Sequence, residues 1–369
     1  MIAGPTPRIL LVTAVTHGHK TYAETLLTAF RERDVPVEHL PVPRSPLTRL
    51  AGLRIRQVRG LDLQAVRRQL ALDLQIRRCA RWAMRSFDLV HVMPHGFAHA
   101  FALAKGIERA CLSVALDSTG RLMREEFGTH RWQERLRERF ERTTFAAADH
   151  LVCLSDWARQ SVLGYGVDPE RIDVIPPSAP LASFRARTLR NGDQLPRIAF
   201  VGAPWRRKGG DLLLRWHQEQ WAERAELHIL CRDVPATVRA CRNVIVHEPI
   251  SRGEVLEVFL PACDLFVLPT RRDQSPWVVA EAATAGLPVV AFGVGGIAEL
   301  IVDGETGFLV PEAQERLFVA AVDTLLRDPT RREAMSRRAA RHALQVLSAK
   351  ANFGRLVDTL MALAQRSRP

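Results

Sequence analysis

Cysteine is scarce in this chain of 369 residues, and the six cysteines show none of the paired spacings that mark a disulfide framework or a zinc site. Reduced thiols in a cytoplasm therefore suit the sequence best. Long apolar runs are missing too: the uncharged segment 282–298 is broken by glycine and proline, which argues against a membrane span. Arg8 leads directly into the apolar run ILLVTAV with no cleavage-like region after it, so we expect no secretory signal.

Lysine is also scarce: four lysines accompany 48 arginines, and the formal net charge is +12. One interpretation is a compositional habit of the source genome, and the other is attraction to a polyanionic surface, either acidic lipid or nucleic acid. Nucleic acid is the weaker of the two, because the chain has no zinc-finger spacing, RNP-like motif or basic stripe interleaved with aromatics. We therefore expect no nucleic-acid partner and keep peripheral contact with an acidic membrane surface as an alternative.

The chain is long enough for two domains, and its hydrophobic content of 47% with 25% charged residues suits a globular enzyme. Residues 8–15 read as a strand, a helix follows from about Tyr22 to Arg33, and VPVEHLPV reads as a second strand. This β-α-β order predicts a doubly wound sheet. The proline-rich exit VIPPS and the polar segment 182–194 predict a domain boundary.

The segment 265–290 is the part around which we expect the rest of the chain to be arranged. It reads as a buried strand, a polar loop, a short helix opened by Pro276 and a second strand. Unpaired N–H groups and the positive end of the helix dipole would lie at the mouth of a sheet, where an anion binds. Asp273 in the loop and Glu281 in the helix place two carboxylates beside that anion site.

This segment resembles the region typical of retaining, nucleotide-sugar-dependent glycosyltransferases of the family 4 group, also called glycosyl transferases group 1. In that family an acidic residue, seven others and a glutamate precede an A-x-x-x-G-x-P-V-[VI] run. Here the frame is Asp273, residues 274–280, Glu281 and AATAGLPVV, with aspartate where the family usually has glutamate. The resemblance implies the α/β GT-B fold, with two Rossmann-like doubly wound parallel-sheet domains facing a cleft.

The same resemblance implies the roles of the two domains. An N-terminal acceptor-binding domain would span residues 1–180, and the C-terminal helix within 350–369 would pack back on it. A C-terminal domain that binds the nucleotide sugar would span residues 195–349. The donor would therefore lie against the second domain and the acceptor against the first.

The start of the second domain, RIAFVGAPWRRKGG, resembles the family's phosphate-binding turn, where a basic pair and backbone amides hold the donor's diphosphate. The matching residues are Gly202, Lys208, Gly209 and Gly210. An arginine commonly follows the first glycine, whereas this chain has Ala203 there and carries Arg206 and Arg207 further along. The role falls to Lys208 with either Arg206 or Arg207, and the sequence does not choose between the arginines.

Sugar transfer develops negative charge on the leaving phosphate, so fixed cations and helix amides are its main catalytic requirement. The candidate catalytic residues implied by the resemblance are Lys208, Arg207, Arg206, Asp273 and Asp117. The candidate donor-binding residues are Gly202, Gly209, Ser275, Pro276, Trp277, Val278 and Glu281. Asp273 would hold hydroxyls of the donor hexose and Glu281 those of the ribose. The alternative for Glu281 is a surface i,i+4 pair, which the absence of basic residues at 277 and 285 weakens.

Two groups in the first half are further candidates. The loop after the first strand holds His17, Gly18 and His19, which read either as acceptor or phosphate contacts or as solvated loop residues. Asp117 follows a strand at the ligand edge of the predicted sheet, and in the resembled family this position faces the reacting sugar. The alternative for Asp117 is a cap for a helix that starts near Arg121.

Residues 49–85 read as a basic amphipathic helix whose apolar stripe includes Leu70, Leu74 and Ile76. Such a helix either packs on its own domain or contacts a membrane surface. The chain has no Asp-x-Asp, so we expect no metal and no cofactor beyond the nucleotide-sugar co-substrate.

Three functions fit these observations. The first is a cytoplasmic retaining hexosyltransferase acting on a glycan, a lipid-linked sugar or a small molecule. The second is a nucleotide-sugar epimerase or hydrolase on the same fold. The third is a non-catalytic nucleotide-sugar-binding protein, suggested by Asp273, Ala203 and the single Gly18.

Overall fold

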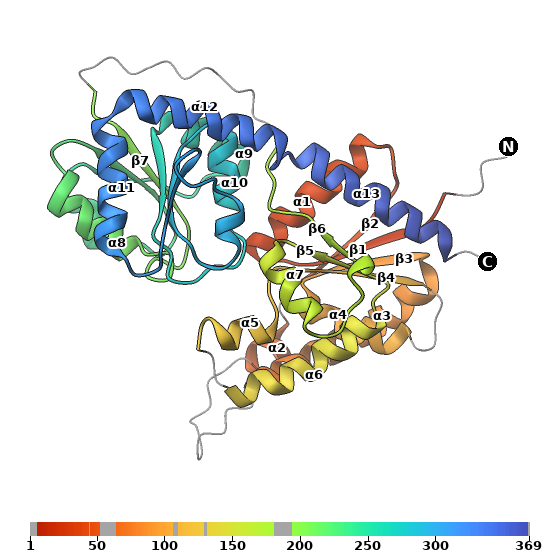
Figure 1. Cartoon of the computed structure of the whole chain (residues 1–369). Coiled ribbons are helices and arrows are strands. Elements are labelled where there is room, and N and C mark those ends of the chain that lie inside the picture. The colour runs from red at the N-terminus through yellow and green to blue at the C-terminus, as the bar shows by residue number, and fades with distance from the viewer. Residues whose placement is uncertain are drawn as a thin grey trace. The chain divides into compact units, whose positions relative to one another are not determined.

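The computed structural model describes residues 6–43, 45–51, 64–105, 110–128, 131–180 and 194–367. The chain separates into two compact units: unit 1 comprises residues 1–176 and 350–369, and unit 2 comprises residues 177–349. Each unit is built on a six-stranded parallel sheet covered by helices (Figure 1). The predicted α/β class with two doubly wound parallel sheets is therefore confirmed. The predicted boundary segment lies outside the described residues except at Gln194.

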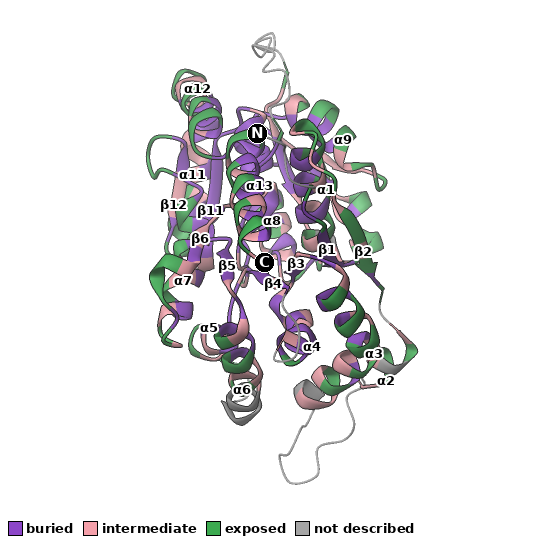
Figure 2. Cartoon of the chain, turned by 90° about the vertical axis from the view of Figure 1, so that its right-hand side faces the viewer, coloured by how far each residue is buried: buried purple, intermediate pink, exposed green. Residues whose placement is uncertain are grey.

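The sheet of unit 1 has the strand order β2-β1-β3-β4-β5-β6. Its strands are β1 (Ile9–Ala14), β2 (Glu38–Val42), β3 (Leu89–Met93), β4 (Cys111–Leu116), β5 (His150–Cys153) and β6 (Ile172–Val174). The inner strands are mostly apolar because helices cover both faces of the sheet. Figure 2 shows β1, β3 and β4 buried. The edge strand β2 is more exposed and tolerates Pro41, since an edge strand has one side without ladder hydrogen bonds.

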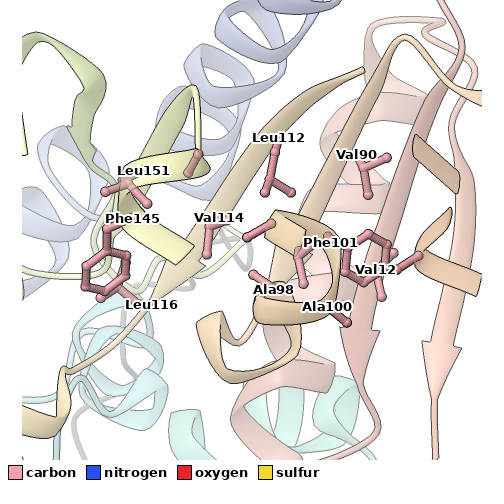
Figure 3. Close-up of a cluster of buried hydrophobic side chains, with 14 of the residues drawn as sticks. Val12, Val90, Ala98, Ala100, Phe101, Leu112, Val114, Leu116, Phe145 and Leu151 are labelled. Carbon is pink, nitrogen blue, oxygen red and sulfur yellow. The ribbon is translucent and has the colours of Figure 1, made fainter. Parts of the chain in front are cut away.

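Helices cover the two faces of this sheet, with α1 and α13 on one face and α3, α4 and α6 on the other (Figure 1). The helices of unit 1 are α1 (His17–Glu32), α2 (Pro46–Ala51), α3 (Gln64–Ser86), α4 (His95–Lys105), α5 (Gly120–Glu125), α6 (Arg131–Ala147), α7 (Asp156–Leu163) and α13 (Ala349–Arg366). The main core lies between the sheet and the helices on its second face (Figure 3). It includes Phe101 and Phe145 together with Val114 and neighbouring residues of the sheet. Burial of these apolar side chains fixes the strand ends that carry the polar residues described below.

The C-terminal helix α13 packs on the first face of the unit 1 sheet. Phe353 is fully buried and its ring lies 5.4 Å from the ring of Tyr22 on α1. Arg33 donates to the carboxylate of Asp358 at 2.9 Å. A Cβ on Gly354 would lie 2.1 Å from the guanidinium of Arg33, so α13 approaches α1 closely at that glycine.

A row of polar side chains crosses four strands beneath α1 and α13. The hydroxyl of Tyr22 lies 2.8 Å from His91 Nε2, and His91 Nδ1 lies 2.9 Å from Ser113 Oγ. Ser113 Oγ lies 3.1 Å from His150 Nδ1, and His150 Nε2 lies 3.2 Å from Asp173. One direction of donation, from Tyr22 to Asp173, gives each ring nitrogen of His91 and His150 a hydrogen-bond partner. Burial, with a further contribution from His150, lowers the pKa of His91 to about 3.

Several predicted boundaries in unit 1 are wrong. The first helix begins at His17 rather than Tyr22. The helix expected to start near Arg121 is α5, which begins at Gly120 and is separated from α6 by a segment in which Gly128 has a φ of +60°. That left-handed conformation favours glycine and does not fit within a continuous right-handed helix.

The predicted basic helix also differs from the structure. It consists of α2 and α3, while residues 52–63, part of the same prediction, lie outside the described residues. Ile76 is buried as predicted, but Leu70 and Leu74 are exposed. The true inward stripe is built largely from small residues, which let α3 lie close to α4: Ala71, Ile76, Ala80, Ala83 and Met84.

The sheet of unit 2 has the order β12-β11-β10-β7-β8-β9. Its strands are β7 (Arg197–Val201), β8 (Glu226–Leu230), β9 (Val244–Val246), β10 (Leu265–Leu268), β11 (Val289–Phe292) and β12 (Gly307–Val310). Its α-helices are α8 (Gly210–Trp216), α9 (Arg252–Glu254), α10 (Trp277–Thr284), α11 (Glu315–Arg327) and α12 (Pro329–Gln345). Between β11 and β12 the chain forms a single 3-10 turn, Gly295–Glu299.

Candidate active site

The topological switch point of unit 2 lies between β7 and β10. β8 and β9 extend the sheet on one side of β7, whereas β10, β11 and β12 follow on the other side. Open α/β sheets bind ligands beyond the carboxyl ends of the strands at such a point. The segments that leave β7 and β10 are the predicted phosphate-binding turn and the predicted acidic loop. The fold therefore brings the two sequence motifs together at one edge.

Gly209 lets the phosphate-binding turn approach the acidic loop. Its φ is +79°, in the left-handed region, and it directly precedes α8. A Cβ at this position would lie 1.9 Å from the carbonyl oxygen of Pro269. Gly202 has a related role, because its Cβ would lie 3.0 Å from Cγ of Lys208. The two glycines therefore make room for the loop and for the lysine stem.

Hydrogen bonds join the backbones of the turn and the loop. The carbonyl of Arg207 accepts from the backbone N–H of Arg271 at 2.9 Å and from Thr270 Oγ1 at 3.2 Å. The guanidinium of Arg207 returns a bond to the carbonyl of Arg272 at 2.7 Å. Three bonds within a few residues hold the two segments as one rigid piece.

A buried ion pair lies at the centre of this piece. Lys208 Nζ donates to Asp273 Oδ2, and the two residues are only 8% and 6% exposed. Arg207 Nη1 lies 3.8 Å from the other carboxylate oxygen. An ammonium group has three donors and a carboxylate has about four acceptor positions, so this pairing leaves both with capacity for a ligand.

The two arginines of the turn are in different environments. The Arg206 side chain is 87% exposed and reaches Asp211 only at 3.9 Å. The Arg207 side chain is 34% exposed and donates to the carbonyls of Arg272 and Ala203 at 2.7 and 3.0 Å. The geometry therefore favours Arg207 as the cation that accompanies Lys208.

Glu281 lies inside α10 and is 7% exposed, so the alternative of a surface i,i+4 pair is wrong. Its carboxylate accepts from Arg252 Nε at 2.8 Å, and Arg252 comes from α9. The same guanidinium lies 5.8 Å from the ring centre of Trp277. Arg252 balances the buried charge, and sequence reasoning missed it because the two partners are far apart in the chain.

The remaining donor-binding candidates lie at the start of α10. Pro276 occupies the N-cap position with extended backbone, Trp277 is the first helical residue, and Val278 is half-buried. Ser275 is buried, and its hydroxyl has no hydrogen-bond partner within the described part of the chain. Burying a hydroxyl without a partner costs about 1–3 kcal/mol. A ligand oxygen at the start of α10 would satisfy it.

Asp117 in unit 1 directly follows β4 and is half-buried at the carboxyl edge of the sheet. Its carboxylate accepts from Ser118 Oγ at 3.3 Å. The alternative that Asp117 caps the next helix is wrong, because Thr119 does so: its Oγ1 accepts from the N–H of Leu122 at 3.3 Å. Asp117 therefore has no role as a helix cap.

The predicted loop of His17, Gly18 and His19 is the first turn of α1, and nothing is described of the His17 side chain. His19 Nδ1 lies 2.7 Å from Thr16 Oγ1. Burial lowers the pKa of His19, Asp117 acts to raise it, and His95 acts to lower it further. His19 therefore interacts electrostatically with Asp117 and with His95, a residue that sequence reasoning missed. The rule that singled out Asp117, a polar residue just past a strand end, also applies to His95.

The described residues contain no group of three or more His, Cys, Asp or Glu side chains placed to hold a metal ion. Within the same ranges, no helix is both long enough and apolar enough to cross a lipid bilayer.

Both units match family models of one enzyme class. Residues 12–178 match the glycosyl transferase 4-like domain, and residues 195–328 match glycosyl transferases group 1. A D-inositol 3-phosphate glycosyltransferase of Kineococcus radiotolerans is 33% identical over 396 aligned positions, covering 88% of this chain and 86% of that protein. One from Thermomonospora curvata is 34% identical but is matched over only 58% of its length, and 59% of this chain.

Solved structures show the same fold at lower identity. Sucrose-phosphate synthase from Thermosynechococcus elongatus gives a TM-score of 0.72 at 18% identity, covering 97% of this chain and all of that one. HepE of Anabaena, solved with UDP-glucose, gives 0.70 at 15% identity, with 96% and 100% covered. The two parallel sheets are thus those of the GT-B class of glycosyltransferases. The chain belongs to the group 1, or family 4, glycosyltransferases, and is a glycosyltransferase enzyme.

Proposed function

We propose that the chain transfers a hexose from a nucleotide-diphosphate sugar to an acceptor hydroxyl, with retention of anomeric configuration and without a metal ion. The observation that carries the proposal is the Lys208–Asp273–Arg207 cluster at the switch point of unit 2, beside the start of α10. Two cations and a helix N-terminus suit a diphosphate, whose charge grows as the sugar leaves.

Lys208 and Arg207 are proposed to stabilise the leaving diphosphate. Asp273 holds the Lys208 ammonium in place, so the lysine does not have to reorganise as charge develops. The guanidinium of Arg207 donates to the backbone carbonyl of Arg272, which holds the arginine in the same rigid piece. In a site of this kind the fixed cations supply what a divalent ion supplies elsewhere, which is the reason for proposing independence from metal.

The carboxylates are proposed to select and orient the two sugars of the donor. Glu281 would accept from the ribose hydroxyls, with Arg252 neutralising its buried charge. Asp273 would accept from hexose hydroxyls through acceptor positions that Lys208 and Arg207 do not use. Asp117 would contact the reacting sugar from unit 1, as the family resemblance implies.

The proposed reaction exchanges one bond for another at the anomeric carbon. The bond from that carbon to the β-phosphate oxygen breaks, and its electron pair leaves with the nucleoside diphosphate. The acceptor oxygen forms the new bond on the same face and loses its proton to the departing phosphate. No oxidant, reductant or additional cofactor is needed.

The acceptor is proposed to be a hydroxyl of a sugar or a cyclitol. The relatives at 33–34% identity are named for transfer to D-inositol 3-phosphate, which makes that compound the first acceptor to test. Glycans and lipid-linked sugars belong to the same chemical class and form the rest of the panel.

Peripheral contact with an acidic membrane is part of the proposal because of the outer face of α3. Leu70, Leu74 and Trp82 are 50%, 65% and 48% exposed on this helix. Exposed arginines share the face: Arg77, Arg78, Arg81 and Arg85. Apolar side chains among arginines suit the boundary of an anionic bilayer. Sedimentation with phosphatidylserine-containing vesicles, but not with pure phosphatidylcholine vesicles, is the expected result, and equal sedimentation with both would contradict it.

The function is tested by incubating the full chain with UDP-, GDP- and ADP-sugars, with and without EDTA, and with the acceptor panel. We expect one donor to yield a glycosylated acceptor of unchanged anomeric configuration at a rate unaffected by EDTA. Loss of activity in EDTA would refute metal independence, and an inverted product would refute retention. Donor hydrolysis or epimerisation with every acceptor would refute transfer, and thermal stabilisation without turnover would indicate a binding protein.

A further inference from the structure

The topological switch point of unit 1 lies between β1 and β3. β2 flanks β1 on one side, whereas β3, β4, β5 and β6 follow on the other. His95 is the first residue of α4 and follows β3 after one intervening residue, so it lies at this point. The first turn of α1, with His19, follows β1 at the same edge. Ligands of open α/β sheets bind at this position.

A buried glutamate fixes the ring of His95. His95 Nε2 lies 3.0 Å from Glu141 Oε1 on α6, and Glu141 is 3% exposed. The carboxylate also accepts from the N–H of Gly120 at 2.8 Å and from the hydroxyl of Tyr165 at 2.5 Å. Burial acts to raise the pKa of Glu141, but the hydrogen bonds of His95 and Tyr165 and nearby Arg137 outweigh it, so the pKa falls. Glu141 is therefore an anion that accepts from Nε2–H.

This arrangement leaves Nδ1 of a neutral His95 ring as a hydrogen-bond acceptor. His95 is 5% exposed, and Nδ1 has no hydrogen-bond partner among the residues that the structure describes. The two other buried histidines of the same sheet, His91 and His150, each have both nitrogens paired. A histidine with only a structural role would be expected to resemble them.

The surroundings of His95 are suited to hydroxyl groups. His19, His95 and Asp117 follow β1, β3 and β4, which are neighbours in the sheet, so all three lie at its carboxyl edge. Gly120, held by Glu141, lies three residues after Asp117 and ties that strand end to His95. A ligand with several hydroxyls can donate one proton to the imidazole and another to the carboxylate.

We propose that His95 is an acceptor-binding residue whose Nδ1 accepts a hydrogen bond from a hydroxyl of a polyol, either a sugar or a cyclitol, while Glu141 holds the ring in position. Identifying that polyol as the acceptor rests on the proposed function. His19 and Asp117 border the same site. Phe145, whose ring centre lies 6.1 Å from that of His95, forms part of its apolar surroundings.

The test compares wild type with two variants, using UDP-glucose as donor and D-inositol 3-phosphate as acceptor probe. His95→Gln places an amide N–H where Nε2 lies, so it keeps the bond to Glu141 and removes Nδ1. We expect its KM for the probe to rise about three- to tenfold, the effect of losing one neutral hydrogen bond, while its Kd for UDP stays within twofold. His95→Phe should raise KM further and also lower the Tm. An unchanged KM in His95→Gln would overturn the proposal.

A second readout does not need turnover. In protein labelled with ¹⁵N-histidine, the Nδ1 resonance of His95 should shift on titration with D-inositol 3-phosphate, while the fully paired His91 should not. Absence of a shift at millimolar probe would also overturn the proposal. Failure to bind any of the UDP-, GDP- and ADP-sugars would instead overturn the proposed function, because that function assigns such a donor to unit 2. The His95 resonance would still report on polyol binding in that case.

Discussion

The two units use the same sheet edge in different ways. In unit 2 the switch point holds fixed charges: Lys208 and Arg207 lie on Asp273, and the backbones on either side are bonded to each other. In unit 1 the switch point holds histidines, one of which faces the buried anion Glu141, and the half-buried Asp117 follows the next strand. Charge and rigidity suit a diphosphate, whereas directional acceptors suit hydroxyl groups.

This difference explains which site the sequence reveals. The proposed diphosphate site is one contiguous turn with a lysine and glycines, so its motif can be recognised in the sequence alone. The proposed polyol site consists of side chains that follow separate strands, so only the fold brings them to one sheet edge. The comparison predicts that substitutions in unit 2 act on donor binding and the chemical step, and that those in unit 1 act on the acceptor or on stability.

The largest effect is expected from Lys208→Ala. Removing a cation from the leaving group should lower turnover on the order of 10²-fold or more, measured as UDP release. Arg239→Ala is the matched control, because Arg239 forms an exposed pair with Glu248 at 2.8 Å and should change turnover less than twofold. Near-normal turnover of Lys208→Ala would show that Lys208 does not stabilise the leaving group. The contrast between a charged site in unit 2 and a neutral site in unit 1 would then fail.

The rigidity of the unit 2 edge is tested by two glycines of similar conformation. Gly209 and Gly304 have φ of +79° and +73°, but only at Gly209 would a Cβ meet another atom, Pro269 O at 1.9 Å. Gly304→Ala should lower the free energy of unfolding by about 1 kcal/mol through backbone strain. Gly209→Ala should cost about 2 kcal/mol more through overpacking. Equal losses in urea unfolding would show that the turn and the loop are not held together.

The assignment of Arg207 over Arg206 is the next test. Arg207→Ala should lower turnover about tenfold, because it removes a charge-assisted contact from the diphosphate site. Arg206→Ala should change it less than twofold, since that side chain is 87% exposed. A larger loss in Arg206→Ala would reverse the assignment, and the Kd of UDP for each variant would show whether binding or the chemical step is affected.

A smaller effect concerns the stability of unit 1 below neutral pH. His91 has a native pKa of about 3 against 6.5 for an unperturbed histidine, so the unfolded chain binds more protons between these values. The free energy of unfolding should therefore fall by about 1 kcal/mol per pH unit from pH 6 to pH 4 because of this residue. His91→Gln should be less stable at pH 7 but lose stability with a shallower slope. Parallel pH profiles of variant and wild type would contradict this account.

Much of the fold could be predicted because buried parallel strands are apolar runs with clear ends. The errors came from helices. The first turn of α1 reads as a polar loop, because its residues show no helical periodicity. In the structure this turn is helical and is accompanied by a contact between Thr16 and His19. Leu70 and Leu74 fit an inward apolar stripe, yet close packing of α3 selects its alanine face instead. Gly128, with its positive φ, is a local sign of the break between α5 and α6.

The candidate sites could be predicted in part for a similar reason. The motif residues of unit 2 lie where the sequence places them, but their partnerships join distant residues: Lys208 with Asp273, and Glu281 with Arg252. The pair of His95 and Glu141 joins α4 to α6, and nothing in either local segment predicts it. Composition and periodicity report local structure, whereas these contacts are set by strand order.

The central claim is that the cations of unit 2 hold the donor's diphosphate. Calorimetric titration of UDP into wild type and into the double variant Arg207→Met, Lys208→Met tests it most directly, because methionine keeps the apolar stem and removes the charge. The account predicts that the variant remains folded and binds UDP at least 10²-fold more weakly, as loss of two charge-assisted contacts implies. Equal affinity for UDP in the two proteins would contradict it.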